Sequence, residues 1–328
     1  MHFVHCPLCG SKRTAPSLQA IDYITQSQHR LFNCSECGLA YVNPQPRKDD
    51  IGIFYPVTYY GGNPFAYEKI DACFRWRKIR ALGLKPGKAL DCGCGKGLLL
   101  GRLKAHGWNV CGTELSEMSA NYGREKLGIE ICSTSLEECR YSNDEFDLIT
   151  LFHSLEHFPD PFRALKEIVR ILKPDGLLIV EVPRAQGVAW KIFKGYWFHL
   201  DIPRHLFHFN DSALEKAITD AGFTVINRKK HDIIYDSFGF MQSLLNVLLK
   251  NYNLLNDINT KRLNLKTITV KKDRRLMIEA YFSLLFQAIF YLPALVIACF
   301  CALCGHGGTL SFLSRKSSQY MSPSAKPD

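Results

Sequence analysis

The stretch Ala89-Leu-Asp-Cys-Gly-Cys-Gly-Lys-Gly97 decides how the middle of the chain is interpreted. Three glycines at alternate positions follow an apolar segment that contains Asp91, and a helical pattern begins at Leu98. Glycine permits a tight turn and close approach of a ligand, and the start of the next helix offers unpaired amides. Because Cys92 and Cys94 have no second ligand pair nearby in sequence, we interpret them as small buried side chains and not as a metal clip.

Short apolar segments alternate with helical patterns on both sides of this turn. The strands that we expect lie at 89–92, 108–112, 129–132, 146–152, 176–182, 223–228 and 308–316. The helices that we expect lie at 67–82, 98–106, 116–127, 161–172 and 213–221. Apolar strands joined by helices predict a parallel sheet covered on both faces. The expected fold class is therefore α/β, a doubly wound, mostly parallel sheet of seven strands, with ligands beyond the carboxyl ends of the strands.

An acid, Glu114, stands at the end of the strand after the glycine turn. A carboxylate at that place can accept hydrogen bonds from both hydroxyls of a ribose. The glycine spacing departs from G-x-G-x-x-G, and no Walker lysine followed by Ser or Thr is present, which weakens a nicotinamide or ATP interpretation.

Together these motifs resemble the class I S-adenosylmethionine-dependent methyltransferases. The matching stretches are LDCGCGKG, GTELS, FDLITLFHSLEHFPDP and LKPDGLLIVEVP. The resemblance assigns to S-adenosylmethionine the residues Asp91, Gly93, Gly95, Gly97, Glu114, Leu115, Phe152 and His153. The first four would surround the methionine part, Glu114 would bind the ribose, Leu115 would touch the adenine, and the last two would lie beside the sulfonium. The acid or amide that often reads the adenine amino group in this family is missing from 133–136, so that contact is left open.

Two C-x-x-C-G motifs near the N-terminus contribute the four cysteines Cys6, Cys9, Cys34 and Cys37. Four thiolates at this spacing predict a closed tetrahedral zinc site, and so small a unit needs the metal to fold. A closed site leaves no position for catalysis, so the expected role of the zinc is structural. With FYPVTYY at 54–60 and HLDIPRHLFHF at 199–209, residues 1 to about 236 resemble a bacterial subfamily of zinc-ribbon methyltransferases often associated with polysaccharide or glycolipid synthesis.

The segment 199–209 gathers histidines, a carboxylate and an arginine after the fifth strand. We expect His205 to act as a base, Asp201 to orient it, and Arg204 to contact an anionic group of the substrate. The alternative is a packed loop in which some of the histidines only satisfy buried carbonyls. His157 is expected to be structural or near the cofactor, with Asp160 capping the following helix.

Composition and charge narrow the class of protein. At 328 residues, 47% hydrophobic and 22% charged, the chain is expected to be globular. No secretory signal is visible, so the 13 cysteines are expected to be reduced in a cytosolic compartment. The net charge is +10, with ten Lys/Arg against four Asp between Lys229 and Arg275. This basic segment precedes the most apolar part of the chain, which points to an anionic membrane surface more than to nucleic acid.

The segment from Tyr281 to Gly305 carries no charged side chain. Residues 284–304 would be about 30 Å long as a helix, enough to cross a hydrocarbon core. Because a core strand is expected at 308–316, the chain must return, which favours a membrane-surface or re-entrant hairpin. We expect it to be broken near Pro293 and paired with 238–249. A true span and a buried dimer or core helix remain alternatives.

The expected domains are a zinc ribbon (1–47), a connector and lid helix (48–86), a methyltransferase core (87–236), an apolar and basic helical insertion (237–305), the last core strand (306–317) and a disordered tail (318–328). The expected activity is methyl transfer (EC 2.1.1.-) from S-adenosylmethionine to a small-molecule, saccharide or lipid-linked acceptor at the inner face of the membrane. The alternatives are an RNA or protein methyltransferase, or a non-catalytic zinc-ribbon binding protein with a degenerate core.

Overall fold

The computed structural model describes residues 3–56, 66–260, 262–263, 265 and 273–318. The chain forms two compact units, the first from 1–61, 183–213 and 229–310, the second from 62–182, 214–228 and 311–328. Most of the predicted tail, residues 319–328, and positions 57–60 of the FYPVTYY motif lie outside the described residues.

The second unit is built on a seven-stranded mixed sheet, which confirms the predicted fold class. Its strands are β4 (Lys88–Cys92), β5 (Asn109–Thr113), β6 (Glu130–Cys132), β7 (Phe146–Phe152), β8 (Leu172–Pro183), β10 (Phe223–Lys229) and β11 (Thr309–Lys316), in the order β10-β11-β8-β7-β4-β5-β6. The central pairs β4/β5, β4/β7, β5/β6 and β7/β8 are parallel. Strand β8 begins earlier than the sequence predicted. The parallel register sets the carboxyl ends of β4, β5 and β7 at one edge, where the glycine turn lies.

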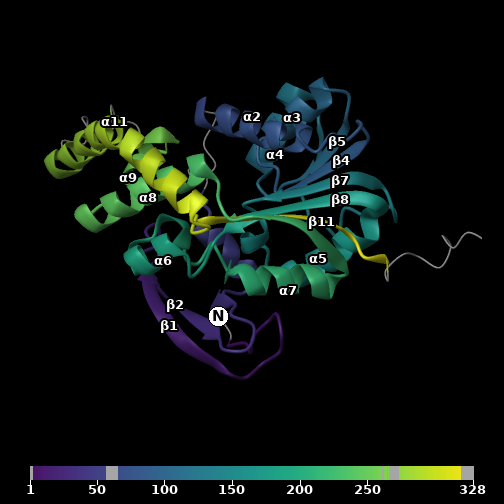
Figure 1. Cartoon of the computed structure of the whole chain (residues 1–328). Helices are drawn as coiled ribbons and strands as arrows, with labels where there is room; N and C mark the ends of the chain where they lie inside the picture. The colour runs from purple at the N-terminus through teal and green to yellow at the C-terminus, as the bar shows by residue number, and fades with distance from the viewer. Residues whose placement is uncertain (1–2, 57–65, 261, 264, 266–272, 319–328) are drawn as a thin grey trace, which may run out of the picture. The chain divides into compact units, whose positions relative to one another are not determined.

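Helices cover both faces of this sheet, with α3 (Leu98–Ala105) and α4 (Glu117–Leu127) on one side and α5 (Pro161–Ile171) and α7 (Asp211–Ala221) on the other (Figure 1). Helix α2 (Ala66–Arg80) precedes β4 and packs on α3. The side chains of Ser116 and Asp160 cap α4 and α5 by accepting from the N–H groups of Ser119 and Arg163, so the predicted cap at Asp160 is confirmed.

The first unit contains a smaller sheet that the sequence did not predict. Its strands are β1 (Thr14–Ile21), β2 (Gln28–Cys34), β3 (Ala40–Val42) and β9 (Phe207–His208), in the order β1-β2-β3-β9. The fourth strand comes from a distant part of the chain and pairs antiparallel with β3, His208 opposite Ala40. The four-cysteine region therefore holds one end of segment 199–209 by backbone pairing.

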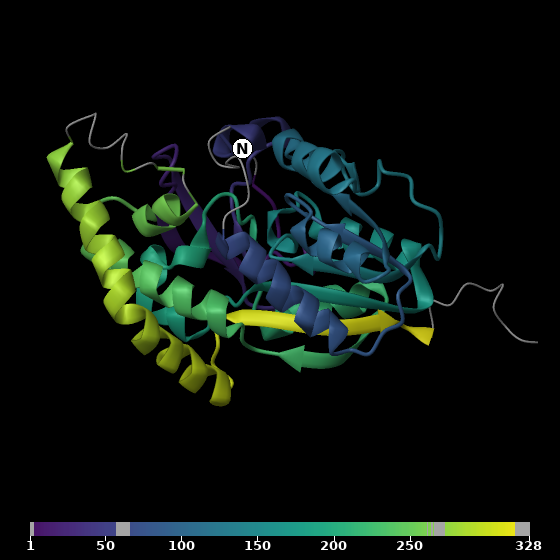
Figure 2. The ribbon, with the colours of Figure 1, turned by 90° about the horizontal axis from the view of Figure 1, so that it is seen from above.

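The first unit also contains α6 (Val188–Phe193), α8 (Ile233–Leu248), α9 (Leu254–Asn259) and α11 (Arg274–Leu303), together with short 3-10 helices that include η1 (Lys48–Phe54), η3 (Lys194–Tyr196) and η4 (Phe198–Leu200). The prediction of a break near Pro293 is wrong, because α11 runs through it as one helix (Figure 2). Proline removes one backbone hydrogen bond, but Phe286 and Ala294 pack against Met241 and Leu245 of α8 and hold the helix together. The predicted pairing with 238–249 is thereby confirmed.

Candidate cofactor site and metal centre

The turn between β4 and α3 depends on three glycines with positive φ, 77° at Gly93, 54° at Gly95 and 72° at Gly97. A Cβ on Gly93 would lie 2.6 Å from the Cβ of Ser154, so this position admits no side chain. A Cβ on Gly95 would meet nothing within 4 Å. The turn is therefore closed against the protein at Gly93 and open at Gly95, where a ligand can approach the backbone.

Glu114 is brought against this turn from the end of β5. Its Oε2 accepts from the backbone N–H of Gly95 at 2.9 Å, and its Oε1 accepts from the N–H of Ser116 at 2.7 Å. Burial raises the pKa of Glu114, and the two backbone donors partly offset that effect. The glycine turn and the acid after β5, which the sequence analysis identified separately, are thus joined by a hydrogen bond.

Asp91 is buried near the end of β4, with 3% of its surface exposed. Its Oδ1 accepts from Thr150 Oγ1 of β7 at 2.7 Å. Burial raises the pKa of Asp91 to about 6, while the hydrogen bond from Thr150 and the charge of Arg75 act in the opposite direction. The ionised carboxylate of Asp91 is therefore buried next to the turn, and its burial costs free energy of folding.

Phe152 and His153 end β7 among charged side chains. The Arg75 guanidinium carbon lies 4.9 Å from the centroid of the Phe152 ring. His153 has a positive φ of 53°, and its Nε2 lies 3.4 Å from Glu181 Oε1. Lys78 Nζ contacts the other oxygen of Glu181 at 2.9 Å. Burial alone would raise the pKa of Glu181, but His153 and Lys78 outweigh it and hold that pKa well below the usual range.

Sequence reasoning missed Arg75, Lys78 and Glu181. A signal was present for Glu181, because it is the one charged residue within the apolar run 177–182. Helix α2 was predicted, but nothing in its sequence showed which of its basic residues would turn toward β7.

Leu115, expected to touch the adenine, is 67% exposed and follows directly after Glu114. The two cysteines of the turn behave as expected, since Cys92 is fully buried and Cys94 packs partly buried against the core. Both act as small core side chains.

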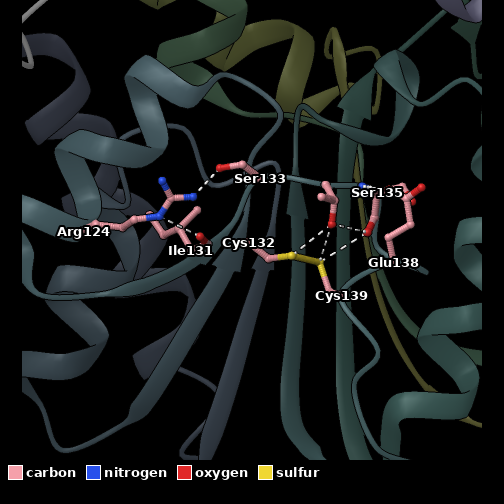
Figure 3. The surroundings of a disulfide bond; sticks show 8 residues. Arg124, Ile131, Cys132, Ser133, Ser135, Glu138 and Cys139 are labelled. Carbon is pink, nitrogen blue, oxygen red and sulfur yellow. Dashed lines mark hydrogen bonds between the residues drawn. A yellow bond between two sulfur atoms is a disulfide. The ribbon is translucent and has the colours of Figure 1, made fainter.

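The exit of β6 holds a disulfide between Cys132 and Cys139 (Figure 3). The expectation of reduced thiols is therefore wrong for this pair, and the other eleven cysteines are free. The Cα atoms of Cys132 and Cys139 lie 6.2 Å apart, within the range of disulfide-bonded pairs, because the loop between the two residues is short. Arg124 donates to the carbonyl of Ile131 at 2.9 Å and to the Ser133 hydroxyl, which fixes the first part of the same loop.

Arg204 is fully buried in the first unit. Its Nη2 lies 2.8 Å from Asp22 and 2.7 Å from Asp201, and its Nη1 donates to the carbonyl of Phe54 at 3.2 Å. These contacts tie segment 199–209 to the ribbon and give Arg204 a structural task. The predicted contact of Arg204 with substrate stays a prediction.

His205 is also buried, and its Nδ1 lies 2.8 Å from the carbonyl oxygen of His199. That carbonyl can only accept, so Nδ1 carries the proton and Nε2 is the acceptor atom of the ring. Burial lowers the pKa of His205 to about 4, against a smaller opposing effect of Asp201. The Asp201 carboxylate itself accepts from Arg204, so a backbone carbonyl and not Asp201 holds Nδ1. Catalysis by His205 stays a prediction.

The four cysteines predicted as metal ligands converge, with their sulfur atoms all within 4.8 Å of one another. Sγ of Cys6 lies 3.5 Å from that of Cys37, and Sγ of Cys9 lies 3.6 Å from that of Cys34. Four sulfurs at about 2.3 Å around one zinc ion stand roughly 3.8 Å apart. Gly10 and Gly38 close the two turns with positive φ, and their N–H groups donate to the carbonyls of Cys6 and Cys34. The cluster could hold a metal ion.

A seven-stranded sheet with an open glycine turn after β4 and an acid after β5 defines the Rossmann-like methyltransferases. A family profile described as "Methyltransferase domain" matches residues 67–228, the part that contains both features. Residues 67–228 are therefore a class I S-adenosylmethionine-dependent methyltransferase domain.

Curated relatives that match the chain include ubiquinone biosynthesis O-methyltransferases. That of Coxiella burnetii (strain Dugway 5J108-111) is 37% identical over 100 residues, which are 29% of this chain and 43% of the relative. That of Actinobacillus pleuropneumoniae serotype 7 (strain AP76) is 35% identical over 140 residues, 40% of this chain and 56% of the relative. The chain thus spans about half the length of the curated relatives it matches. A solved structure, a putative sarcosine dimethylglycine methyltransferase from Galdieria sulphuraria, aligns with a TM-score of 0.49 at 14% identity, covering 82% of this chain and 99% of that one.

Proposed function

We propose that this protein transfers a methyl group from S-adenosylmethionine to an oxygen of a small-molecule, saccharide or lipid-linked acceptor. The observation that carries the proposal is the bond between Glu114 and Gly95, which joins the open glycine turn to the acid at the end of the neighbouring strand. It supports an adenosyl ligand because a fixed carboxylate and an exposed backbone meet at the carboxyl edge of a parallel sheet.

The residues of this edge fit the cofactor. The open space beside Gly95 admits a ligand, and the carboxylates of Asp91 and Glu114 offer acceptors for an ammonium group and for ribose hydroxyls. S-Adenosylmethionine supplies a methyl group on a sulfonium when bound. The task left to the protein is to hold the acceptor in line and, for a hydroxyl, to remove a proton.

His205 is our proposed base. Its low pKa keeps the ring neutral at pH 7, the form of the imidazole that can accept a proton, and the hydrogen bond from Nδ1 to the carbonyl of His199 fixes the orientation of the ring. The names of the curated relatives, which are O-methyltransferases, support an oxygen acceptor. The saccharide or lipid-linked class is supported by the wider resemblance of residues 1–236, and RNA or protein would be the competing acceptors.

We also propose that Cys6, Cys9, Cys34 and Cys37 bind a structural zinc ion. The support is the sulfur spacing and the position of the cluster beside β3, which pairs with β9 next to His205. Zinc would stabilise the ribbon and, through it, the backbone of segment 199–209.

Titration calorimetry with S-adenosylmethionine tests the activity at its first step. We expect binding by the wild type, strongly weakened binding by Asp91→Ala, and unchanged binding by the control Asp175→Ala, which alters an exposed acid in β8. Absence of binding in all three proteins would overturn the enzyme proposal and favour a non-catalytic ribbon protein.

The acceptor class is tested by incubating the protein and methyl-labelled cofactor with bacterial extracts. Label in glycan or lipid fractions is the expected result. Label that is released by nuclease or protease treatment would contradict it.

A further inference from the structure

Helix α11 is apolar on two opposite sides. One side packs within the first unit, where Ala280, Phe286, Ala294 and Ala298 are buried. The other side carries Ile278, Leu285, Leu292, Val296, Phe300 and Leu303, which are between 59% and 88% exposed. At about 100° per residue these six side chains fall within an arc of roughly 80°. We call them the outer stripe.

The outer stripe is long and free of charge. Its first and last members are 25 positions apart, about 37 Å along the helix, and no charged residue lies between Glu279 and Leu303. Monomeric soluble proteins rarely expose an apolar patch of more than a few hundred Å². We therefore expect another molecule or a membrane to cover an exposed apolar surface of this length.

Basic residues stand at both ends of the stripe. Arg274, Arg275 and Lys250 are exposed at its first end, and Lys250 is placed there because the next residue, Asn251, donates to Glu279. Lys230 and His231 lie at the other end, since a Cβ on Gly307 would approach the carbonyl of Lys230 and the Cβ of His231 to less than 3 Å. The charges match an anionic surface that covers the whole helix.

A second copy of the chain fits this pattern poorly. In a parallel pair of α11 helices, each basic end would face the same basic end of the partner. In an antiparallel pair, Arg274 and Arg275 of one copy would face Lys230 of the other, and the ion pairs of Arg275 with Glu279 and of Lys230 with Asp211 would offset only part of this repulsion. Like charges meet in either arrangement, whereas an anionic bilayer offers the opposite charge at both ends.

A single crossing of the bilayer conflicts with how the helices are anchored. Asp236, in the first turn of α8, accepts from the Thr309 hydroxyl at 2.6 Å and from the N–H of Gly308 at 3.0 Å, just after α11. The start of α8 and the end of α11 are therefore fixed to each other, but a spanning α11 that begins across the bilayer would need α8 and α9 to cross as well.

Helix α8 is unsuited to that crossing. Its 16 residues are about 24 Å long, shorter than a hydrocarbon core of about 30 Å. Its Ser243 accepts from the backbone N–H of Phe198, and its Asn246 donates to the carbonyl of Tyr196 and to Asn253. These bonds hold α8 against the rest of the first unit, whereas the outer stripe of α11 is exposed and can contact lipid.

We propose that α11 is an interfacial helix that lies flat on an anionic bilayer, with its outer stripe in the acyl boundary and the basic residues at both ends against lipid head groups. This inference goes beyond methyl transfer and does not depend on it. It makes the protein monotopic, attached to one leaflet by one helix face.

Flotation of the full chain with vesicles tests the inference. We expect binding to phosphatidylcholine vesicles that contain phosphatidylglycerol, weaker binding to phosphatidylcholine alone, and partial loss at high salt. The double variant Leu285→Glu/Val296→Glu places two carboxylates in the stripe and should weaken binding roughly tenfold or more. The control Ile226→Glu, at an exposed apolar position of β10, should bind like the wild type.

Circular dichroism and cofactor calorimetry on the same samples show that each variant is folded. Three results would overturn the inference: equal vesicle binding by the double variant, a dimer that the double variant abolishes without any vesicle binding by the wild type, or wild-type protein that resists alkaline extraction from membranes as a spanning protein does. Failure of cofactor binding alone would overturn the proposed activity and leave this inference standing.

Discussion

The carboxylate of Glu114 accepts a hydrogen bond from the backbone N–H of Gly95 across 2.9 Å, joining two positions that are 19 residues apart. The bond fixes the most open glycine of the turn before any ligand arrives. A turn that is already ordered loses less conformational entropy when it binds a ligand. Glu114 thereby shapes the turn and also offers the acceptor expected to bind the ribose.

The variant Glu114→Gln tests whether Glu114 both orders the glycine turn and binds the ribose. Glutamine keeps one acceptor oxygen but loses the charge and the second acceptor, so we expect cofactor affinity to fall roughly 10- to 100-fold, as for loss of a hydrogen bond to a charged group. Calorimetry is the measurement. Glu117→Gln is the control, because Glu117 follows three positions later on the surface and pairs with Arg124. An equal effect of both changes would contradict the assignment.

Asp91→Asn should stabilise the protein without ligand while weakening cofactor binding. Burial raises the pKa of Asp91 to about 6 from an ordinary value of 3.8, so its contribution to stability is complete below about pH 4 and is lost as pH rises through 6. Asparagine avoids the buried charge, and we expect a gain of about 3 kcal/mol at pH 7. Urea unfolding at pH 7 and pH 4 measures it, and a gain that persists at pH 4 would show another cause.

Lys78→Met should destabilise the methyltransferase domain. Glu181 is buried, and its pKa is held well below the usual range by His153 and Lys78, so this pairing stabilises the fold above the unfolded pKa of about 4.5 and fades as pH falls below it. We expect a loss of about 2–4 kcal/mol at pH 7, shrinking in acid. Lys69→Met, at an exposed position of the same helix, should cost little in the same unfolding experiment.

Removal of zinc should abolish methyl transfer while sparing cofactor binding. The ribbon sheet pairs with β9, and Arg204 ties segment 199–209 to Asp22, so loss of the metal would loosen His205. The bonds around Asp91 and Glu114 lie within the second unit. The experiment uses chelated protein or the variant Cys34→Ser. Elemental analysis measures the zinc content, incubation with extract measures methyl transfer, and calorimetry measures cofactor binding. Full activity without zinc would refute a structural role.

If the disulfide between Cys132 and Cys139 forms, the number of reactive thiols should rise when the protein is reduced. Denatured, unreduced, metal-free protein should expose 11 reactive thiols, and reduction should raise the number to the 13 of the sequence. Because the bond closes a short loop, the variant Cys132→Ser/Cys139→Ser should lose at most about 2–3 kcal/mol of stability. Thirteen reactive thiols before reduction would show that the bond does not form.

Much of the fold was predictable because local patterns determine it. Apolar runs gave the strands from β4 to β8 together with β10 and β11, and Asp160 marked the start of α5. In the ribbon, β1 and β2 were missed because neither contains an apolar run, and β3 and β9 were missed because they have only three and two residues. The break expected at Pro293 failed because packing against α8 outweighs the loss of one hydrogen bond.

By itself, the sequence determined the sheet, the glycine turn, the four-cysteine cluster and a charge-free segment long enough to cross a bilayer, because each depends on residues that are close along the chain. The tertiary structure decided which side chains that are far apart in the sequence contact one another. It paired Lys78 with Glu181 and Arg204 with Asp22, and it left one face of α11 bare. Such contacts depend on which faces of distant elements meet, and no local pattern of residues contains that information.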